Sequence, residues 1–414
     1  MVTDYKETEI GIIPSDWLLE KLRVVAEFAS GSTPSREFQQ RYFTNGTIFW
    51  VKTMDLNNSE ILVTGEKVTE IALKETSSLK IFPPNTVLVA MYGGFNQIGR
   101  TGILKINACV NQALTAVFVN EDLLDSNFLI NYFNYRVEYW KGVASSSRKD
   151  PNITSKDIKD FPIVIPSITE QKEISKVLED VEKLIFKSEN LILKKTNIKQ
   201  GIMNKLFKPT HEWNSKPLGE LTYLIPSGIY GKEFYQTNLT PQKVATTAHI
   251  DEDDRWNQKS MNTRYFSPEE VNKFQTRKGD LIIVKSSGSA EKIQSGKIGY
   301  ISESIESKFL FSNFLLLLRP HGILSKYLYY YLTSYNVKSL LPTLVEASTY
   351  PNLRLNDYLA LNIPFPNDKE QIQITNTLTD IDLELDTLKK KVLKYKMIKQ
   401  GMMQSLLTGK IRLV

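Results

Sequence analysis

Apolar residues recur at alternating spacings of four and three along two long stretches of the chain, which is the pattern of a coiled-coil seam. In the later stretch they are Ile374, Leu378, Ile381, Leu385, Leu388, Val392, Tyr395, Met402 and Leu406. In the earlier stretch they are Ile174, Leu178, Val181, Ile185, Ile192, Ile202 and Leu206, with Ser188, Lys195 and Lys199 interrupting the seam. Pro166 and Pro366 lie just upstream, where a helix has not yet begun. The pattern predicts two helices of roughly 35–40 residues, each about 55–60 Å long at 1.5 Å per residue.

A long helix with a single apolar stripe needs a partner face. The economical partner for each helix is the other one, and the pair is most simply antiparallel if a pseudo-two-fold axis relates the two halves of the chain. The alternative is that each helix packs only on its own globular domain.

The two stretches belong to an internal repeat. Glu170-Gln171 returns as Glu370-Gln371, and the segment 198–201 returns as 398–401, both at an offset of 200 residues. Upstream the match is weaker and its offset drifts: Ser30-Gly31 aligns with Ser227-Gly228, and Trp17 with Trp213. We interpret the chain as a duplicated unit with a variable part followed by a near-constant part. Duplication for stability alone is the alternative, but a shared frame with diverged globular parts favours two different ligands.

The variable parts mix two kinds of element. Short β-like runs such as Val87–Ala90 and Leu281–Val284 end in glycine-rich loops, and aromatic-rich helical stretches follow near 128–140 and 327–335. The predicted class is α+β, with two repeated mixed α/β domains separated by two long helices packed as an antiparallel coiled coil. The expected segments are a first domain at 1–166, a first helix at 167–208, a second domain at 209–366 and a second helix at 367–414.

Composition limits the classes of protein to consider. No apolar run approaches the ~20 residues of a membrane span, and the acidic N-terminus lacks the features of a signal peptide, so we expect a cytoplasmic protein. The net charge of +6 is compatible with a polyanion partner but is shared by many proteins that bind none. Cys109 is the only cysteine and the three histidines are far apart, so we expect no metal site.

Catalytic motifs fail one by one. The only double proline, Pro83-Pro84, is followed by Asn85, the wrong order for an amino-methyltransferase. Gly296-Lys297 is followed by isoleucine rather than serine or threonine, so the phosphate-binding loop is absent too. Asp253 and Asp254 are interpreted as solvated loop charges. We therefore predict no catalytic residues and no cofactor.

Two loops of the first variable part instead carry groups suited to DNA. Amides pair with adenine and arginine pairs with guanine, while lysines and small hydroxyls typically hold phosphates. The candidates here are Tyr92, Gly93, Gly94, Asn96, Gln97, Arg100, Ser147, Arg148 and Lys149. The second variable part offers Lys232, Lys285, Ser286, Ser287, Lys292, Lys297, Thr349 and Tyr350, and its lysines are expected to contact phosphates. For any one of these residues, an ordinary surface turn is the alternative.

The order of several further segments resembles the target-recognition domain of type I restriction-modification specificity subunits. The segments are 31–35 with Ser32 and Thr33, 48–53 with Lys52, Ile98–Arg100, Ala108–Ala113, and Asn152-Ile153 leading into the long helix. The likeness covers essentially the whole chain, twice. The second copy departs from it, because Phe311–Phe314 stands where the first copy has Cys109–Gln112.

The resemblance implies a function as well as a fold. Each variable domain would read one half of a split site in double-stranded DNA, and the helices would set the gap between the halves. The helices would also dock two modification subunits, which bind S-adenosylmethionine and methylate adenine; restriction subunits add ATP-driven translocation and cleavage. Two other classes stay open at this point: a stand-alone methyltransferase or nuclease, and a coiled-coil scaffold that binds only proteins.

Overall fold

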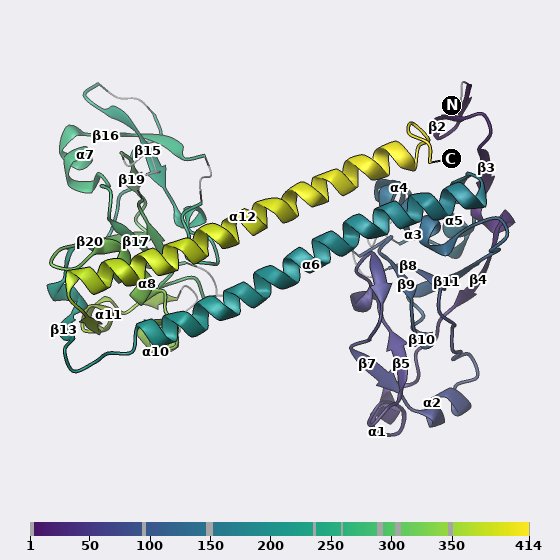
Figure 1. Cartoon of the computed structure of the whole chain (residues 1–414), viewed down its shortest axis with the longest axis horizontal. Helices are drawn as coiled ribbons and strands as arrows, with labels where there is room; N and C mark the ends of the chain where they lie inside the picture. The colour runs from purple at the N-terminus through teal and green to yellow at the C-terminus, as the bar shows by residue number, and fades with distance from the viewer. Residues whose placement is uncertain are drawn as a thin grey trace. The chain divides into compact units, whose positions relative to one another are not determined.

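The computed structural model describes residues 4–413 apart from 93–96, 146–151, 235–236, 258–259, 288–292, 303–307 and 347–350. Its contacts form two compact units. Unit 1 comprises residues 1–189 and 390–414, and unit 2 comprises residues 190–389. Two 39-residue helices, α6 (Ile168–Leu206) and α12 (Asp368–Leu406), each contribute to both units (Figure 1). Each unit therefore combines residues that are far apart in the sequence. The expected division of the chain into four consecutive segments stays a prediction.

Unit 1 is a mixed structure built on a five-stranded sheet in the order β4-β11-β8-β9-β6 and a three-stranded sheet in the order β10-β5-β7. Two-stranded pairs β1-β2 and β12-β3 complete it. Its strands are β1 (Tyr5–Thr8), β2 (Gly11–Pro14), β3 (Leu18–Lys21), β4 (Ala26–Ser30), β5 (Ile48–Val51), β6 (Ser59–Ile61), β7 (Glu66–Val68), β8 (Val87–Ala90), β9 (Thr101–Leu104), β10 (Ala108–Val110), β11 (Leu114–Val119) and β12 (Pro162–Ile165). Its shorter helices are α1 (Gln39–Tyr42), α2 (Glu70–Glu75), α3 (Ser126–Tyr135), α4 (Val137–Ser145) and α5 (Ser155–Lys159).

Unit 2 repeats this plan with a four-stranded sheet in the order β14-β20-β17-β18 and a three-stranded sheet in the order β16-β15-β19. The pairs β13-β23 and β21-β22 complete it. Its strands are β13 (Asn214–Pro217), β14 (Thr222–Ile225), β15 (Thr240–Ala245), β16 (Asn262–Phe266), β17 (Leu281–Val284), β18 (Ile298–Tyr300), β19 (Leu310–Phe311), β20 (Leu315–Pro320), β21 (Val345–Glu346), β22 (Asn352–Leu353) and β23 (Asn362–Phe365). Its shorter helices are α7 (Pro268–Phe274), α8 (Ser325–Leu332), α9 (Tyr335–Lys338), α10 (Leu341–Leu344) and α11 (Leu355–Leu359).

The two units share strand pairing as well as strand order. In unit 1, β11 lies antiparallel between β4 and β8, and β10 runs parallel to β5. In unit 2, β20 lies antiparallel between β14 and β17, and β19 runs parallel to β15. The expected repeated α+β fold is therefore confirmed. The runs Val87–Ala90 and Leu281–Val284 are strands β8 and β17, and every residue of both is buried.

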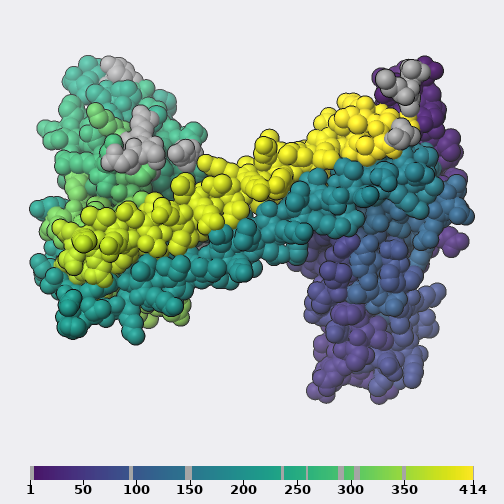
Figure 2. Space-filling view, viewed as in Figure 1, coloured from purple at the N-terminus to yellow at the C-terminus, as the bar shows by residue number. Residues whose placement is uncertain are grey.

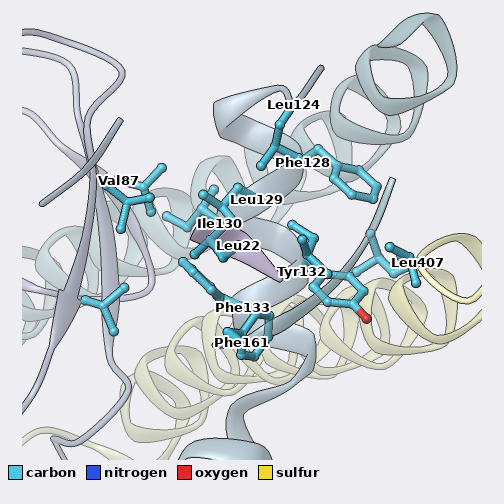
Figure 3. Close-up of a cluster of buried hydrophobic side chains, with 14 of the residues drawn as sticks. Leu22, Val87, Leu124, Phe128, Leu129, Ile130, Tyr132, Phe133, Phe161 and Leu407 are labelled. Atoms are coloured by element: carbon cyan, nitrogen blue, oxygen red, sulfur yellow. The ribbon is translucent and has the colours of Figure 1, made fainter. Parts of the chain in front are cut away.

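The core of unit 1 draws on both ends of the chain. Aromatic residues of α3 and α4 meet Phe161, whose ring stacks on Trp140 at 4.7 Å between centroids. Figure 3 shows Phe161 beside Phe133 of α3. Leu407, which follows α12, is 1% exposed in the same cluster and is labelled beside Tyr132 in Figure 3. Burying one such leucine stabilises the folded state by about 1.5–3 kcal/mol. Residues beyond α12 are therefore part of the first unit's core.

The two long helices pair antiparallel within each unit. In unit 1, Glu189 of α6 meets Lys396 of α12 at 2.7 Å, and Glu182, earlier on α6, pairs with Lys399, later on α12. The same reversal of order holds in unit 2 (Lys195 with Glu384, Lys199 with Asp382). The helices lie side by side in Figure 2, with α6 in teal and α12 in yellow. The seam predicted from the apolar spacing is buried at Ile174, Leu178, Ile185, Ile374, Leu378, Leu385 and Val392.

The lysines that interrupt the first seam are explained by these pairs. Lys195 lies 2.7 Å from Glu384 and Lys199 lies 2.7 Å from Asp382. The side chains of Lys199 and Asp382 are only 16% and 18% exposed, and Asp382 also accepts from Arg255 at 2.7 Å. The seam therefore continues through charge pairs where apolar residues are missing.

A buried glutamine attaches the start of each long helix to its globular part. Gln171 accepts from the amide of Asp125 at 2.8 Å and donates to the carbonyl of Pro166 at 2.9 Å. Gln371 accepts from the amide of Leu324 and donates to the carbonyl of Pro366, both at 2.9 Å. Each of these contacts satisfies a backbone group that burial would otherwise leave without a partner. The repeated glutamine is thus a structural attachment point.

One sequence interpretation is wrong. Asp254 is not a solvated loop charge: it is 2% exposed, pairs with Lys338 and accepts from the amide of Ile298 at 3.0 Å. Its φ of 58° places the backbone in the left-handed region, which aspartate tolerates better than most residues. Its neighbour Asp253 does remain exposed, at 59%, and pairs with Lys389. In the part of the chain that is described, no helix is long and apolar enough to cross a membrane.

Candidate nucleic-acid interface

Several candidate segments of unit 1 meet at the ends of its strands. The amide of Ser32 donates to the carbonyl of Val110 at 2.8 Å, joining the end of β4 to the end of β10. The amide of Met91, just after β8, donates to Ala113 at 2.9 Å. Ile153 in turn donates to the carbonyl of Met91 at 2.9 Å. The segments around 32, 91, 111 and 153, which are far apart in sequence, therefore lie together.

Side chains extend this cluster. Tyr92, which is 37% exposed, donates its hydroxyl to the carbonyl of Gln112 at 2.8 Å. Gln97 donates to the sulfur of Met54 at 3.2 Å, which connects its loop to the turn after β5. Thr33 is half-buried beside Ser32 in sequence. The described candidates Ser32, Thr33, Tyr92, Gln97 and Arg100 thus belong to one region of the unit.

Lys52 lies in a charged cluster at the end of β5. Its ammonium group is 2.8 Å from Glu66, and the guanidinium of Arg36 is 2.8 Å from the other oxygen of the same carboxylate. The hydrogen bond from Lys52 is the main cause that holds the pKa of Glu66 below its ordinary value, and Arg36 adds to it. Arg36 also lies over the ring of Phe43 at 4.2 Å. One carboxylate therefore orients two cations that phosphate oxygens would attract.

Unit 2 builds the same arrangement from different residues. The amide of Ile229 donates to Phe311 at 2.8 Å, that of Lys285 to Phe314 at 2.9 Å, and that of Leu353 to the carbonyl of Lys285 at 2.9 Å. These are the counterparts of the bonds made by Ser32, Met91 and Ile153. The side chain of Lys285 donates to Ser227 at 3.2 Å, and Ser286 forms a bridge to Asn352. The candidates Lys285, Ser286 and Ser287 therefore occupy the second copy of the site.

The backbone makes Lys297 the counterpart of Arg100. Arg100 donates its amide to Gln97 at 3.1 Å and accepts from Ala90 at 2.9 Å. Lys297 donates to Gln294 at 3.1 Å and accepts from Val284 at 2.9 Å. Gln97 and Gln294 thus hold equivalent places, each three residues before a basic residue. A glutamine amide can both accept and donate hydrogen bonds, whereas a basic side chain only donates them. At this spacing the two side chains can offer these groups to a base edge or a phosphate.

A glycine holds each of these turns in place. Gly99 has φ +71° and Gly296 has φ +90°, a region that residues with a Cβ rarely adopt. A Cβ at Gly99 would lie 2.5 Å from Trp140, and one at Gly296 would lie 2.6 Å from Leu341. The turns pack closely on their units, so the side chains of Gln97 and Arg100, or of Gln294 and Lys297, start from a fixed backbone.

The remaining candidates divide into two groups. Lys232 is exposed and forms a backbone bridge with Tyr265 in unit 2, three residues after Ile229. The others lie outside the described residues: Gly93, Gly94, Asn96, Ser147, Arg148, Lys149, Lys292, Thr349 and Tyr350. Each of these belongs to a segment flanked by residues of the site.

Sequence reasoning missed Arg36, Gln294 and the equivalence of Arg100 with Lys297. The signal for the last two was present, because Gln97-Ile98-Gly99-Arg100 and Gln294-Ser295-Gly296-Lys297 share glutamine, glycine and a basic residue at one spacing. Arg36 had a weaker signal, its position soon after the segment 31–35. No similar pattern points to metal chemistry: within the described ranges, no group of three His, Cys, Asp or Glu side chains could hold an ion. Burial raises the pKa of the Cys109 thiol to about 11, so it is not poised as a nucleophile.

Sequence comparison identifies relatives of both halves of the chain. A family described as the type I restriction modification DNA specificity domain matches residues 14–197 and again 211–395. The MjaIX specificity subunit of a type I restriction enzyme from Methanocaldococcus jannaschii is 35% identical over 200 residues, which cover 47% of this chain and 44% of that protein. The MjaVIII specificity subunit from the same organism is 23% identical over 438 aligned residues, covering 99% of this chain and 96% of that protein.

Solved structures show the same fold. The S subunit of a type I restriction-modification system from M. genitalium superposes with a TM-score of 0.56 at 15% identity, covering 94% of this chain and 96% of that one. A chain from a study of complex assembly and conformational transition of the type I R-M system gives a TM-score of 0.58 at 15% identity, covering 96% and 99%.

Proposed function

Because the chain belongs to the type I restriction-modification DNA specificity family and is a specificity subunit of that kind, we propose that it reads a bipartite site in double-stranded DNA. Each unit reads one half of the site through the cluster of loops at its strand ends. The chain directs partner subunits to the site and performs no chemistry itself. Methylation and cleavage belong to those partners, which supply the methyl donor and the ATP-driven steps.

The observation that carries this proposal is the duplicated hydrogen-bond scaffold with diverged side chains. Three backbone bonds recur in both units with lengths that agree within 0.1 Å: Ser32 and Ile229, Met91 and Lys285, Ile153 and Leu353. The side chains on this common frame differ, as those of Arg100 and Lys297 do, and both of these are half-buried. Backbone geometry fixes where a side chain begins, and side-chain chemistry decides which base it binds. A backbone scaffold that is the same in both units while its side chains differ therefore suits two domains that recognise different DNA sequences.

The finer assignment within each site follows from chemistry. Gln97 and Arg100 present an amide and a guanidinium suited to adenine and guanine edges, whereas Lys52, Arg36 and Ser32 present groups suited to phosphates. In unit 2, Gln294 and Lys297 occupy the positions that contact bases, and Lys285 and Ser287 occupy the positions that contact phosphates of the DNA.

The helices supply the surfaces for two copies of one modification subunit. Leu193 and Leu393 lie at equivalent positions of the repeat, and each is 61% exposed. Ile198 and Ile398, again 200 residues apart, are 48% and 40% exposed. Large apolar side chains left in solvent on a helix mark a contact surface for another protein. Since one member of each pair belongs to each unit, the chain offers two matching surfaces.

The test is to map methylated adenines in cells that express the chain with its modification partner. We expect methylation confined to one bipartite motif, with the purified chain alone transferring no methyl group to DNA from labelled S-adenosylmethionine. The control is the partner expressed without the chain, which should leave the motif unmethylated.

Three outcomes contradict the proposal. Methyl transfer by the purified chain would make it an enzyme. Methylation without a fixed motif would mean that the chain does not set specificity. Absence of any salt-dependent DNA affinity, even with the partner present, would leave a scaffold that binds only proteins.

A further inference from the structure

The C-terminal residues of the chain form an ionic clamp in unit 1. The guanidinium of Arg412 donates to both oxygens of Glu170, at 2.6 and 2.7 Å, and to both oxygens of Asp16, at 2.9 and 2.8 Å. Trp17 donates its indole N–H to Glu170 at 3.1 Å and lies under the guanidinium at 5.4 Å. Glu170 and Trp17 are fully buried. The arginine therefore completes a site made of a carboxylate and an indole.

The repeat provides the carboxylate and the indole again in unit 2, but not the arginine. Glu370 is the counterpart of Glu170 and Trp213 that of Trp17. The position 200 residues before Arg412 is Glu212, whose side chain is 81% exposed. The indole nitrogen of Trp213 is buried without a hydrogen-bond partner. In the described part of unit 2, the carboxylate oxygens of Glu370 also have no hydrogen-bond or ion-pair partner.

These two residues line a cavity of about 420 Å³, together with Lys205, Lys208, Thr210 and Gln373. The two lysines are exposed at its rim and oppose a simple cation. A guanidinium differs from a simple cation because its planar fork matches a carboxylate through two hydrogen bonds and stacks on an indole. The chemistry of the cavity therefore selects arginine, and the rim lysines favour an arginine that has acidic neighbours.

We propose that this cavity in unit 2 accepts an arginine side chain of the modification subunit, in the way that the clamp of unit 1 accepts Arg412. The partner contributes to unit 2 the guanidinium that unit 1 takes from its own chain. The C-terminal segment of a second copy is a poor alternative, because its Arg412 would have to give up four hydrogen bonds in its own unit. This inference rests on the proposed function, since it assumes that a modification subunit binds.

The experiment uses titration to measure the affinity for the modification subunit of the unmodified full chain and of three variants. Glu370→Gln keeps the shape of the side chain but removes its charge, and we expect affinity to fall about 10- to 100-fold, as is typical when a hydrogen bond to a charged group is lost. Asp368→Asn is the matched control: it removes one charge from the same helical turn but does not line the cavity, and it should bind like the unmodified chain. Glu212→Arg, an exposed change that cannot disturb the core, should also lower affinity by supplying a competing guanidinium.

The outcomes separate the two proposals. Equal affinity of Glu370→Gln and Asp368→Asn would overturn the cavity proposal while leaving the proposed function intact. If the unmodified chain did not bind the partner, the proposed function itself would fail. A small molecule is the other source of a guanidinium: saturable binding of free arginine to the chain alone, abolished by Glu370→Gln while partner affinity stayed unchanged, would overturn the assignment to a protein.

Discussion

Replacing Arg412 by alanine should destabilise unit 1 far more than its position two residues from the C-terminus suggests. Glu170 is fully buried in the folded chain, and the change removes four hydrogen bonds and leaves its carboxylate with a single donor, Trp17. Removing one member of a buried ion pair costs about 3–5 kcal/mol, because the remaining charge keeps its desolvation penalty. The bonds to Asp16, whose side chain is 56% exposed, add little.

We therefore expect a loss of about 3 kcal/mol in the free energy of unfolding of unit 1. For a unit of about this size, 1 kcal/mol corresponds to roughly 2–4 °C in melting temperature, so its transition should fall by about 6–12 °C. The measurement is scanning calorimetry of the full chain. Lys396→Ala, which breaks the exposed pair with Glu189, is the control, and it should cost no more than about 1 kcal/mol.

A second variant tests the cause. In the double variant Arg412→Ala with Glu170→Gln the buried charge is absent, so part of the lost stability should return. Acid titration gives an independent check, because the hydrogen bond from Arg412 lowers the pKa of Asp16 below its ordinary value. A lowered pKa stabilises the folded state above the unfolded pKa, and this contribution is lost as the pH falls through the folded value. A loss below 1 kcal/mol in Arg412→Ala, or no recovery in the double variant, would refute the reasoning.

Three further predictions concern recognition. Arg100→Ala should relax specificity at one half-site only, at a cost of about 1–3 kcal/mol, read from the methylated motif; equal loss on all DNA sequences would instead identify a phosphate contact. Lys297→Ala distinguishes two interpretations. If Lys297 contacts a phosphate, as the sequence suggests, the salt dependence of DNA affinity should lose about one unit of slope with specificity unchanged. If Lys297 is equivalent to Arg100, specificity at the other half-site should relax. Inserting seven residues after Lys187 and after Thr387 keeps the seam in phase and adds about 10 Å of helix. At 3.4 Å per base pair the gap between methylated half-sites should then grow by about three base pairs with both half-sites retained, and an unchanged gap at full activity would show that the helices do not set it.

The long helices could be predicted from sequence because their signal is periodic and local. Their bounds, Ile168–Leu206 and Asp368–Leu406, follow the prolines at 166 and 366 closely, and the antiparallel arrangement was the simplest one for a duplicated stripe. What the pattern could not show is why lysines interrupt the first seam. Lys199 meets Asp382 only because the helices are staggered in one particular way, and that stagger depends on tertiary packing.

The site was predictable only in part, for the same reason. Loops with glycine, amides and basic residues indicate a contact surface. Strand order, however, decides which of these loops lie next to one another in the folded unit. The bonds from Ser32 to Val110 and from Ile153 to Met91 span long distances in sequence, and no local signal encodes them. The solvated interpretation of Asp254 failed because its burial depends on Lys338 and on strand β18, both remote along the chain.

The repeated ion pair across the helices has a consequence for shorter chains. Glu182 pairs with Lys399 and Lys199 pairs with Asp382, and each pair maps onto the other when 200 is added to one residue and subtracted from the other. A chain that ended at residue 208 would carry Glu182 and Lys199 on one helix, with both complements missing. Two such chains would satisfy each other through the same pairs and bury the same seam, forming a symmetrical dimer with two identical readers. Such a dimer would recognise an inverted repeat, so covalent joining of the halves is what allows this protein to read two different sequences.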